Sequence, residues 1–230
     1  MIAQNVPMFH SLSLSEMSMV GSLQAICDQD TSAHGQRVML LAEGVARELQ
    51  IAEDEIFLVC LAALLHDIGK ANIPEAILNK RGPLDELELR VIRRHPEFGQ
   101  MMLLQVGGIF ERLAPAVLTH HERWDGKGYP NKVSGEEIPL AARIIAVTDA
   151  YDAMVQRRAY HKPLTHTEAC VELQRCAGSQ FDPHIVALFL SLLELQGYSK
   201  HIRAVGEVEW AGVKCVKPSL QSDEFVHVLV

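Results

Sequence analysis

Basic residues are scarce in this sequence of 230 residues. Lysine and arginine together number 21, against 29 aspartates and glutamates, and the formal net charge is −8. Proteins that bind nucleic acid polymers or anionic membranes without specificity carry basic surfaces, so this composition argues against both classes. A small anionic ligand is compatible with it, because such a ligand needs only a local positive site, and metal ions can supply one.

Long apolar runs are also missing. The longest, Ile56–Leu65, is too short to span a bilayer, so we expect no membrane insertion. The N-terminus has no basic start followed by an apolar stretch, so the sequence predicts no secretory signal. The five cysteines are odd in number and form no Cys-x-x-Cys pair. This pattern indicates reduced core residues of a cytoplasmic protein rather than disulfides or a thiolate metal site.

Apolar residues at helical spacing dominate the chain. Hydrophobic residues make up 48% of it, enough for one globular domain with a core. We find no internal repeat and no low-complexity segment. Periodicity and capping signals predict an all-α fold. The predicted helices run from His34 to about Leu49, over Asp54–Asp67, Leu84–Arg94, Glu111–His121 and Pro139–Met154, from Thr165, and from Pro183 to about Leu195. Pro96 either ends the third of these or opens another.

The two ends of the chain are predicted to differ from this domain, which we place at residues 21–197. The composition of residues 1–20 does not decide between a helix, an arm and a disordered tail. Two β-prone stretches, 205–216 and 224–230, mark a C-terminal extension over residues 198–230.

Ionisable side chains interrupt the apolar helices. His66 and Asp67 close a buried helix, and Lys70 lies one turn further on the same side. Such a trio could hold a divalent metal beside an ammonium group. His120 and His121 stand side by side before a loop rich in glycine turn signals, which is rare as pure structure.

Several of these positions have a plainer interpretation. The first trio could be a helix-end histidine beside an Asp–Lys pair. His34 could be a satisfied core histidine, and His95 a simple helix terminus. Asp149 lies inside an apolar helix, where a buried carboxylate needs a partner or a metal. Asp152, one turn further, is expected to face solvent.

The combination is more informative than its members. Imidazoles and carboxylates on the buried sides of four or five helices favour a polynuclear site of nitrogen and oxygen ligands, to which Fe, Mn or Zn are suited. Without thiolate spacing, a structural zinc site is not expected. The candidate ligands are His34, His66, Asp67, His95, His120, His121 and Asp149.

Six segments resemble the HD-GYP domain, a branch of the HD superfamily of metal-dependent phosphohydrolases. They are HGQRV (34–38), HDIGK (66–70), HP (95–96), HHERWDGKGYP (120–130), IPLAARIIAVTDAYDAM (138–154) and SQFDPHIV (179–186). HDIGK alone indicates only the superfamily, whereas HHERWDGKGYP together with FDP is highly specific. The resemblance implies a bacterial, cytoplasmic, all-α HD-domain helical bundle that hydrolyses cyclic di-GMP to pGpG and/or GMP.

The resemblance also implies roles for single residues. The seven candidate ligands fall on the family's metal ligands, with Asp67 as the acid that bridges two metals. Lys70 falls on a lysine that contacts the substrate phosphate, and Arg158 on an arginine used for the ligand's phosphates. The signature residues border the nucleotide pocket, although the plainer interpretation is that they only pack the loop; they are Gly128, Tyr129 and Pro130. Two or three divalent ions are expected, with iron or manganese favoured.

Two features depart from the family pattern. Some members bind a third metal through a glutamate where this chain has Asp30, which is shorter by one methylene. The family often reads Ser-Asp-Arg-Pro-Tyr-Arg after the aspartate helix, and this chain reads VQRRAYH over residues 155–161. His161 and Lys162 stand where a basic phosphate contact would be. This departure puts phosphate binding, and with it specificity or rate, in question.

The resulting prediction is a phosphodiesterase in which a hydroxide that bridges two metals attacks the phosphorus. The alternatives are a phosphodiesterase for cyclic GMP-AMP, a different HD phosphohydrolase such as a nucleotidase, and a non-catalytic signalling adaptor that binds nucleotide or metal. The full ligand set with Lys70 argues against the adaptor, and the GYP loop with the second histidine pair argues against the nucleotidase. Expected partners are a cyclic dinucleotide, and a second copy of the chain or a signalling protein such as a diguanylate cyclase.

Overall fold

The computed structural model describes residues 12–27, 29–80, 82–156 and 163–195. These residues form helices joined by loops and no β-sheet, which confirms the predicted all-α class. None of the described helices is both long and apolar enough to cross a membrane. The predicted β-prone extension lies outside the described residues, as do Arg158, His161 and Lys162.

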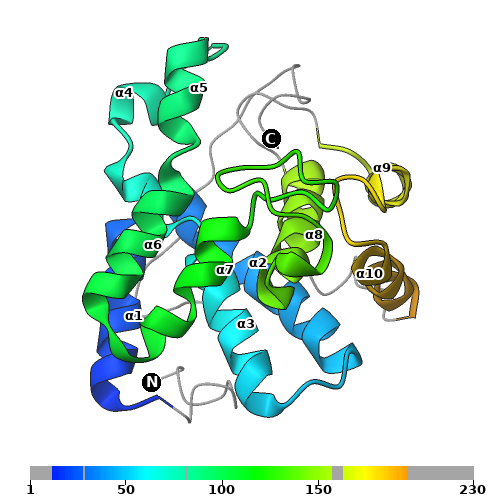
Figure 1. The fold of residues 1–230 in the computed structure, drawn as a ribbon, viewed down its shortest axis with the longest axis horizontal. Coiled ribbons are helices and arrows are strands. Elements are labelled where there is room, and N and C mark those ends of the chain that lie inside the picture. The colour runs from blue at the N-terminus through cyan, green and yellow to red at the C-terminus, as the bar shows by residue number, and fades with distance from the viewer. Residues whose placement is uncertain (1–11, 28, 81, 157–162, 196–230) are drawn as a thin grey trace.

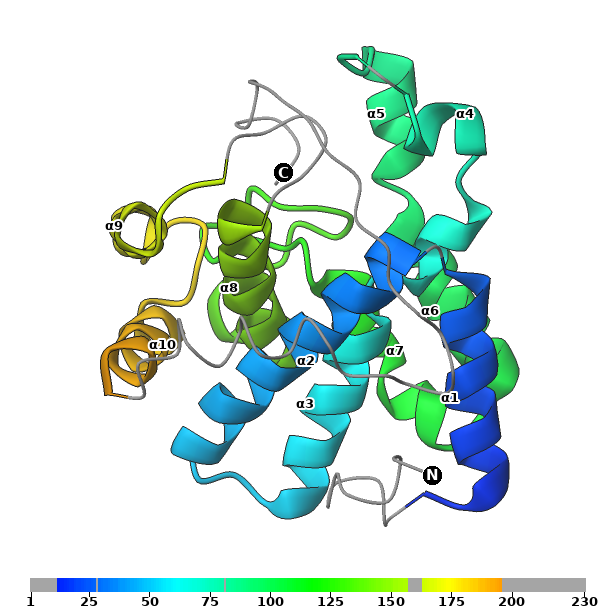
Figure 2. The ribbon, with the colours of Figure 1, turned by 180° about the vertical axis from the view of Figure 1, so that it is seen from behind.

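The helices surround a central group (Figure 1). In this group α2 packs against α3 and α8, and α7 packs against α3 and α8. Two views show α1, α4, α5 and α6 on one side of it and α9 and α10 on the other (Figure 2). The α-helices are α1 (Leu14–Ile26), α2 (Gln29–Glu48), α3 (Glu53–Leu65), α4 (Glu75–Leu78), α5 (Glu86–Ile92), α6 (His95–Val106), α7 (Ala114–Thr119), α8 (Leu140–Val155), α9 (His166–Cys176) and α10 (Pro183–Leu195). The 3-10 helices are η2 (Ile68–Asn72), η3 (Gly108–Arg112) and η4 (Gly135–Glu137).

The core forms where the sequence predicts it. α3 is buried along its length from Ile56 to Leu65. α2 turns its predicted stripe inward, with Val38, Leu41 and Val45 buried. A helix that is apolar on all sides must be surrounded, and α3 is surrounded because neighbours pack against several of its faces.

Some helix boundaries differ from the prediction for local reasons. The segment predicted as one helix over Glu111–His121 is divided into η3 and α7, because Pro115 lacks a donor N–H and fits only the first turn of a new helix. Pro96 likewise opens α6 rather than ending the helix before it. The predicted capping box of Thr165 and Glu168 is confirmed at the start of α9. The helices α1 and α4 were not predicted.

Two glycines let η2 and α6 cross in close contact. A Cβ atom at Gly69 would overlap the carbonyl oxygen of His95 and lie 2.5 Å from the nitrogen of Gly99. A Cβ atom at Gly99 would lie 2.8 Å from a methyl carbon of Val117. Since η2 directly follows His66 and Asp67, this crossing brings the end of α3 against the start of α6.

Replacing Gly69 with alanine is expected to destabilise the fold by about 1–3 kcal/mol, because the methyl group overlaps backbone that cannot move cheaply. The free energy of unfolding from chemical denaturation measures the effect. Gly21→Ala is the matched control, because Gly21 is an exposed glycine of α1 with nothing within 4 Å of its Cβ position. That change should stabilise α1 by up to about 1 kcal/mol. Equal stabilities for Gly69→Ala and wild type would contradict the close crossing.

Candidate metal centre

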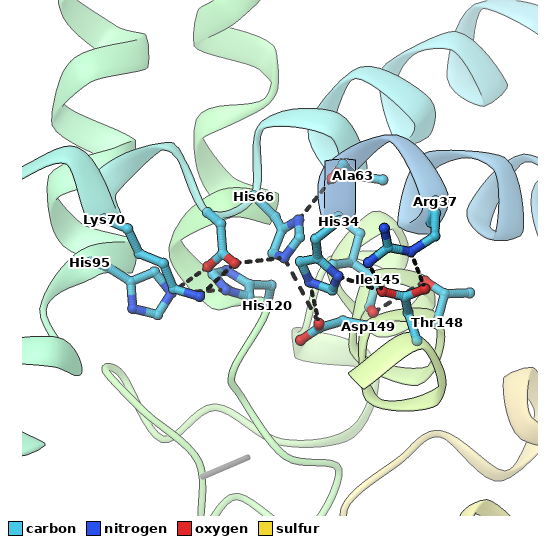
Figure 3. A network of polar contacts seen from close by, with 12 residues as sticks. His34, Arg37, Ala63, His66, Lys70, His95, His120, Ile145, Thr148 and Asp149 are labelled. Carbon is cyan, nitrogen blue, oxygen red and sulfur yellow. Dashed lines mark hydrogen bonds and ion pairs between the residues drawn. The ribbon is translucent and has the colours of Figure 1, made fainter. Parts of the chain in front are cut away.

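The predicted metal ligands meet at the C-terminal end of α3. Figure 3 shows His34, His66, His95, His120 and Asp149 at this place. α2 and α8 each supply one ligand, α6 begins with one, and the ends of α3 and α7 each supply an adjacent pair. The ligands are His34 from α2, His66 and Asp67 after α3, His95 from α6, His120 and His121 after α7, and Asp149 from α8. Most are almost fully buried, and His121 and Asp149 are half-buried.

Three groups of ligand atoms, each within 4.8 Å of one another, occur among the described residues. They are His34, His66 and Asp149; His66, Asp67 and His120; and His95, His120 and His121. Asp67 lies between the other two groups, with its Oδ2 3.4 Å from Nε2 of His66 and its Oδ1 3.3 Å from Nε2 of His95. Each carboxylate oxygen therefore faces a different part of the centre, as a ligand shared by two cations requires.

Three of the imidazoles are oriented by backbone carbonyls in the last turns of helices. A carbonyl can only accept, so the Nδ1 atom must carry the proton and donate it, which leaves a lone pair on Nε2. The Nδ1–H groups donate from His66 to Ala63 (2.7 Å), from His95 to Ile92 (2.9 Å) and from His120 to Val117 (2.7 Å). Carbonyls at helix ends lack intrahelical partners, so these bonds also cap the helices.

The resulting lone pairs point at one another. The Nε2 atoms of His95 and His120 lie 3.2 Å apart, although neither has a proton to donate in this tautomer. Nε2 of His66 is buried and forms no hydrogen bond. Buried polar atoms without partners are rare and costly. Divalent cations would satisfy these three atoms, so the residues present fit the metals that the motifs imply.

Burial keeps most of the imidazoles neutral. It lowers the pKa of His95 to about 4 and that of His121 to about 3, and it lowers the pKa of His120 well below its ordinary value. Burial acts in the same direction on His66, but the interactions with Asp67, the negative charge of Asp149 and the hydrogen bond to Ala63 together outweigh it and raise the pKa of His66. Neutral imidazoles are the form that binds metals.

The two carboxylates remain ionised. Burial acts to raise the pKa of Asp67, but the Lys70 ammonium and the neighbouring imidazoles hold it well below its usual range. Nζ of Lys70 lies 2.6 Å from Oδ2 of Asp67, which confirms the predicted proximity of the two. Burial likewise acts to raise the pKa of Asp149, and its hydrogen bond with His34 holds that pKa below its usual range.

The glycine-rich loop packs against the centre. The Tyr129 ring stacks on His121 with centroids 4.9 Å apart. A Cβ at Gly128 would lie 2.5 Å from the Cα of Glu122, so only glycine lets the loop fold back this far. Glu122 is buried and accepts hydrogen bonds from the backbone N–H groups of Asn131 (2.6 Å) and Lys132 (2.9 Å), which closes the loop. The loop therefore packs tightly, as the plainer interpretation holds, and still places Tyr129 on a candidate ligand.

One sequence expectation is wrong. Asp152 does not face solvent but is fully buried, and it accepts a hydrogen bond from Nδ1 of His34 at 2.7 Å. Arg37 contacts the same carboxylate through both of its oxygens. The signal was present in the sequence, because Asp152 and Arg37 each follow a candidate ligand by one helical turn. Asp30 is exposed in the first turn of α2 and belongs to none of the three groups.

A profile of the HD domain family matches residues 21–185. The chain belongs to the HD domain family. The match agrees with the resemblance that the motifs carry. In solved structures this HD domain resembles an HDG"Y"P protein from Bdellovibrio bacteriovorus, with a TM-score of 0.58 and 19% identity, over 78% of this chain and 58% of the other. It also resembles a cyclic GMP-AMP specific phosphodiesterase of V. cholerae, with a TM-score of 0.56 and 18% identity, over 84% of this chain and 54% of the other. These likenesses confirm the fold.

Sequence relatives of this HD domain are closer. It is 38% identical over 177 residues to a cyclic di-GMP phosphodiesterase of Thermotoga maritima, a match that covers 76% of this chain and 48% of the relative. It is 39% identical over 163 residues to a 3'3'-cGAMP-specific phosphodiesterase of Vibrio cholerae, which covers 70% of this chain and 31% of the relative. The chain thus spans less than half the length of these curated relatives.

Chelation of divalent metal is expected to lower the thermal midpoint of this HD domain, and added Mn²⁺ should restore it. Metal at one hundred times its Kd contributes about 2.7 kcal/mol to stability if the unfolded chain does not bind it. Differential scanning calorimetry with and without EDTA measures the shift. Asp67→Ala should abolish most of the shift, whereas Asp54→Ala, an exposed change in the first turn of α3, should preserve it. A full shift in Asp67→Ala would contradict the central position of Asp67.

Proposed function

We propose that this HD domain is a metal-dependent phosphodiesterase that hydrolyses a cyclic dinucleotide, with cyclic di-GMP as its preferred substrate and pGpG and/or GMP as products. The observation that carries the proposal is the position of Asp67. It presents one oxygen to each half of a cluster of imidazoles, and it holds a lysine ammonium at the edge of that cluster. The named activities of the curated relatives support the same reaction class.

Two cations would be held by the seven ligands that the structure brings together. One would use His34, His66 and Asp149, the other His95, His120 and His121, and Asp67 would serve both. Nitrogen and oxygen donors in this proportion suit iron or manganese. When bound, such metals lower the pKa of coordinated water toward neutrality and thereby supply a nucleophile. Asp30, exposed at the start of α2, is the candidate for a third cation.

The chain's own side chains would bind and orient the substrate. Lys70 is half-buried beside Asp67, where its ammonium can neutralise charge that develops on the phosphoryl oxygens. The guanidinium of Arg93 lies 5.6 Å from the Tyr129 ring centroid, on the loop that stacks against His121. Arg93 was not among the residues found from the sequence. It adds a second positive charge near the cluster, which a substrate with two phosphates can use.

Other parts of the proposal rest on the motifs. Arg158, with His161 and Lys162, would contact the second phosphate, and the signature residues Gly128 and Pro130 would shape the nucleotide pocket. A cytoplasmic location is expected from the number and spacing of the cysteines, which suit reduced thiols. A second copy of the chain or a diguanylate cyclase would be the protein partner.

Cyclic GMP-AMP is the second candidate substrate. The comparisons are compatible with it, because relatives named for each of the two cyclic dinucleotides match this chain at similar identity. The base-reading residues are not identifiable in the sequence, so the two substrates must be compared directly.

Protein purified without oxygen, with its metal content recorded, is expected to hydrolyse cyclic di-GMP faster than 3'3'-cGAMP. Chromatography of the products measures both rates and shows whether the reaction stops at the linear dinucleotide. Asp67→Ala should give no detectable product, and Lys70→Ala should lower kcat by roughly 10²–10³-fold. A metal-loaded wild type that is inactive on cyclic di-GMP would overturn the preferred substrate, and activity on 3'3'-cGAMP alone would establish the second candidate.

Arg93→Gln is expected to raise KM for the cyclic dinucleotide about tenfold or more, with kcat changed less, because a charged hydrogen bond is worth about 1.5–3 kcal/mol. Arg94→Gln is a matched control with the same loss of charge one residue away. Arg94 is exposed and directed at Glu97 and Phe98, so its replacement should leave KM unchanged. Equal effects of the two changes would indicate a general charge effect and remove Arg93 from the substrate site.

A further inference from the structure

His34 is held differently from the other oriented imidazoles. Its Nδ1 donates to the carboxylate of Asp152 at 2.7 Å, whereas the Nδ1 atoms of His66, His95 and His120 donate to neutral backbone carbonyls. Its Nε2 lies 2.9 Å from Oδ1 of Asp149, in the first group of ligands. Among the hydrogen bonds described for these imidazoles, only that of His34 joins Nδ1 to a carboxylate, that of Asp152, while its Nε2 faces the other candidate ligands.

Asp152 is itself fixed in place. Its Oδ1 accepts from Nε of Arg37 at 2.8 Å and its Oδ2 from Nη2 at 2.9 Å, a bidentate contact that sets the plane of the carboxylate. The carboxylate is fully buried. α2 supplies both His34 and Arg37, and α8 supplies both Asp149 and Asp152, so the contact spans one turn of each helix. Figure 3 shows His34 and Arg37 directed at the same part of α8.

A carboxylate behind an imidazole changes the imidazole as a ligand. It draws the Nδ1 proton toward itself, increases the basicity of Nε2 and holds the ring in one orientation. Backbone carbonyls orient their imidazoles as well, but they carry no full charge. The two parts of the centre therefore differ electrostatically, although each contains more than one imidazole.

We propose that Asp152, clamped by Arg37, is a positioning residue that makes the metal position served by His34, His66 and Asp149 the tighter of the two. The inference rests on the proposed function only in that both require bound metal. It predicts that the two cations load in order, the His34 position first and the His95, His120 and His121 position second.

Mn²⁺ binding to the metal-free protein tests the proposal, with free Mn²⁺ followed by its electron paramagnetic resonance signal. The wild type is expected to show two classes of site. Asp152→Asn keeps the shape of the side chain but removes its charge, so it should weaken the tighter class by about 10–100-fold and leave the weaker class unchanged. His34→Ala should remove the tighter class of site. The double variant with His34→Ala and Asp152→Asn should bind Mn²⁺ at the weaker class as His34→Ala alone does.

Asp182→Asn is the matched control. Asp182 is also a buried carboxylate paired with an arginine, Arg143, at 2.8 Å, but it contacts none of the seven ligands in the described hydrogen bonds and ion pairs. Its replacement should leave both classes unchanged. Circular dichroism of the metal-free protein shows whether Asp152→Asn folds. If it does not, Arg37→Gln is the alternative variant. It leaves the hydrogen bond between His34 and Asp152 in place, so it should weaken the tighter class of site by less.

Three results would overturn the proposal: a single class of equivalent sites in the wild type, equal weakening of both classes in the folded variants, or no weakening in either. Hydrolysis assays on the same proteins distinguish failure of the proposal on Asp152 from failure of the proposed function. An active enzyme with equivalent sites overturns only the role of Asp152. Two unequal, Asp152-dependent classes in a protein that hydrolyses no cyclic dinucleotide support the inference and overturn only the substrate.

Discussion

The contact between Asp67 and its neighbours determines the rest of the centre. An ionised carboxylate at the end of an apolar helix is unfavourable unless positive or donor groups surround it, and Asp67 has Lys70 on one oxygen and imidazoles facing both. Those neighbours reach it because η2 crosses α6 at two glycines, which leaves no side chain between the two backbones. The apolar helix α3, the crossing and the imidazole cluster are therefore parts of one arrangement.

Helix ends perform much of the positioning. His66 and His120 follow the last residues of α3 and α7, and each donates its Nδ1 proton to a carbonyl that the helix itself leaves without a partner. The same bond ends the helix and selects the tautomer whose free nitrogen faces the cluster. In this way helices whose cores are made of aliphatic side chains can present polar groups at a common point without polar side chains in their interiors.

Much of this arrangement was predictable from the sequence, and the exceptions have physical reasons. The ligands follow from motif spacing, because His66, Asp67 and Lys70 must share one side of a helix end. The buried helices follow from apolar periodicity. Asp152 was misjudged because its spacing of one turn from Asp149 also fits a solvated residue, and its partners His34 and Arg37 lie far away in the sequence. Arg93 and Glu122 were missed for a similar reason, since their partners lie in a loop whose path the sequence does not specify.

The hydrogen bond between His34 and Asp152 joins residues 118 positions apart in the chain. Contacts of such long sequence separation are slow to form, because closing the intervening chain costs conformational entropy. During synthesis from the N-terminus, the imidazoles of α2, α3, α6 and α7 all emerge before α8 supplies the last carboxylates. The nascent chain therefore carries an incomplete set of donors until α8 has been made, so a metal position that includes Asp149 would be completed only after translation of that helix.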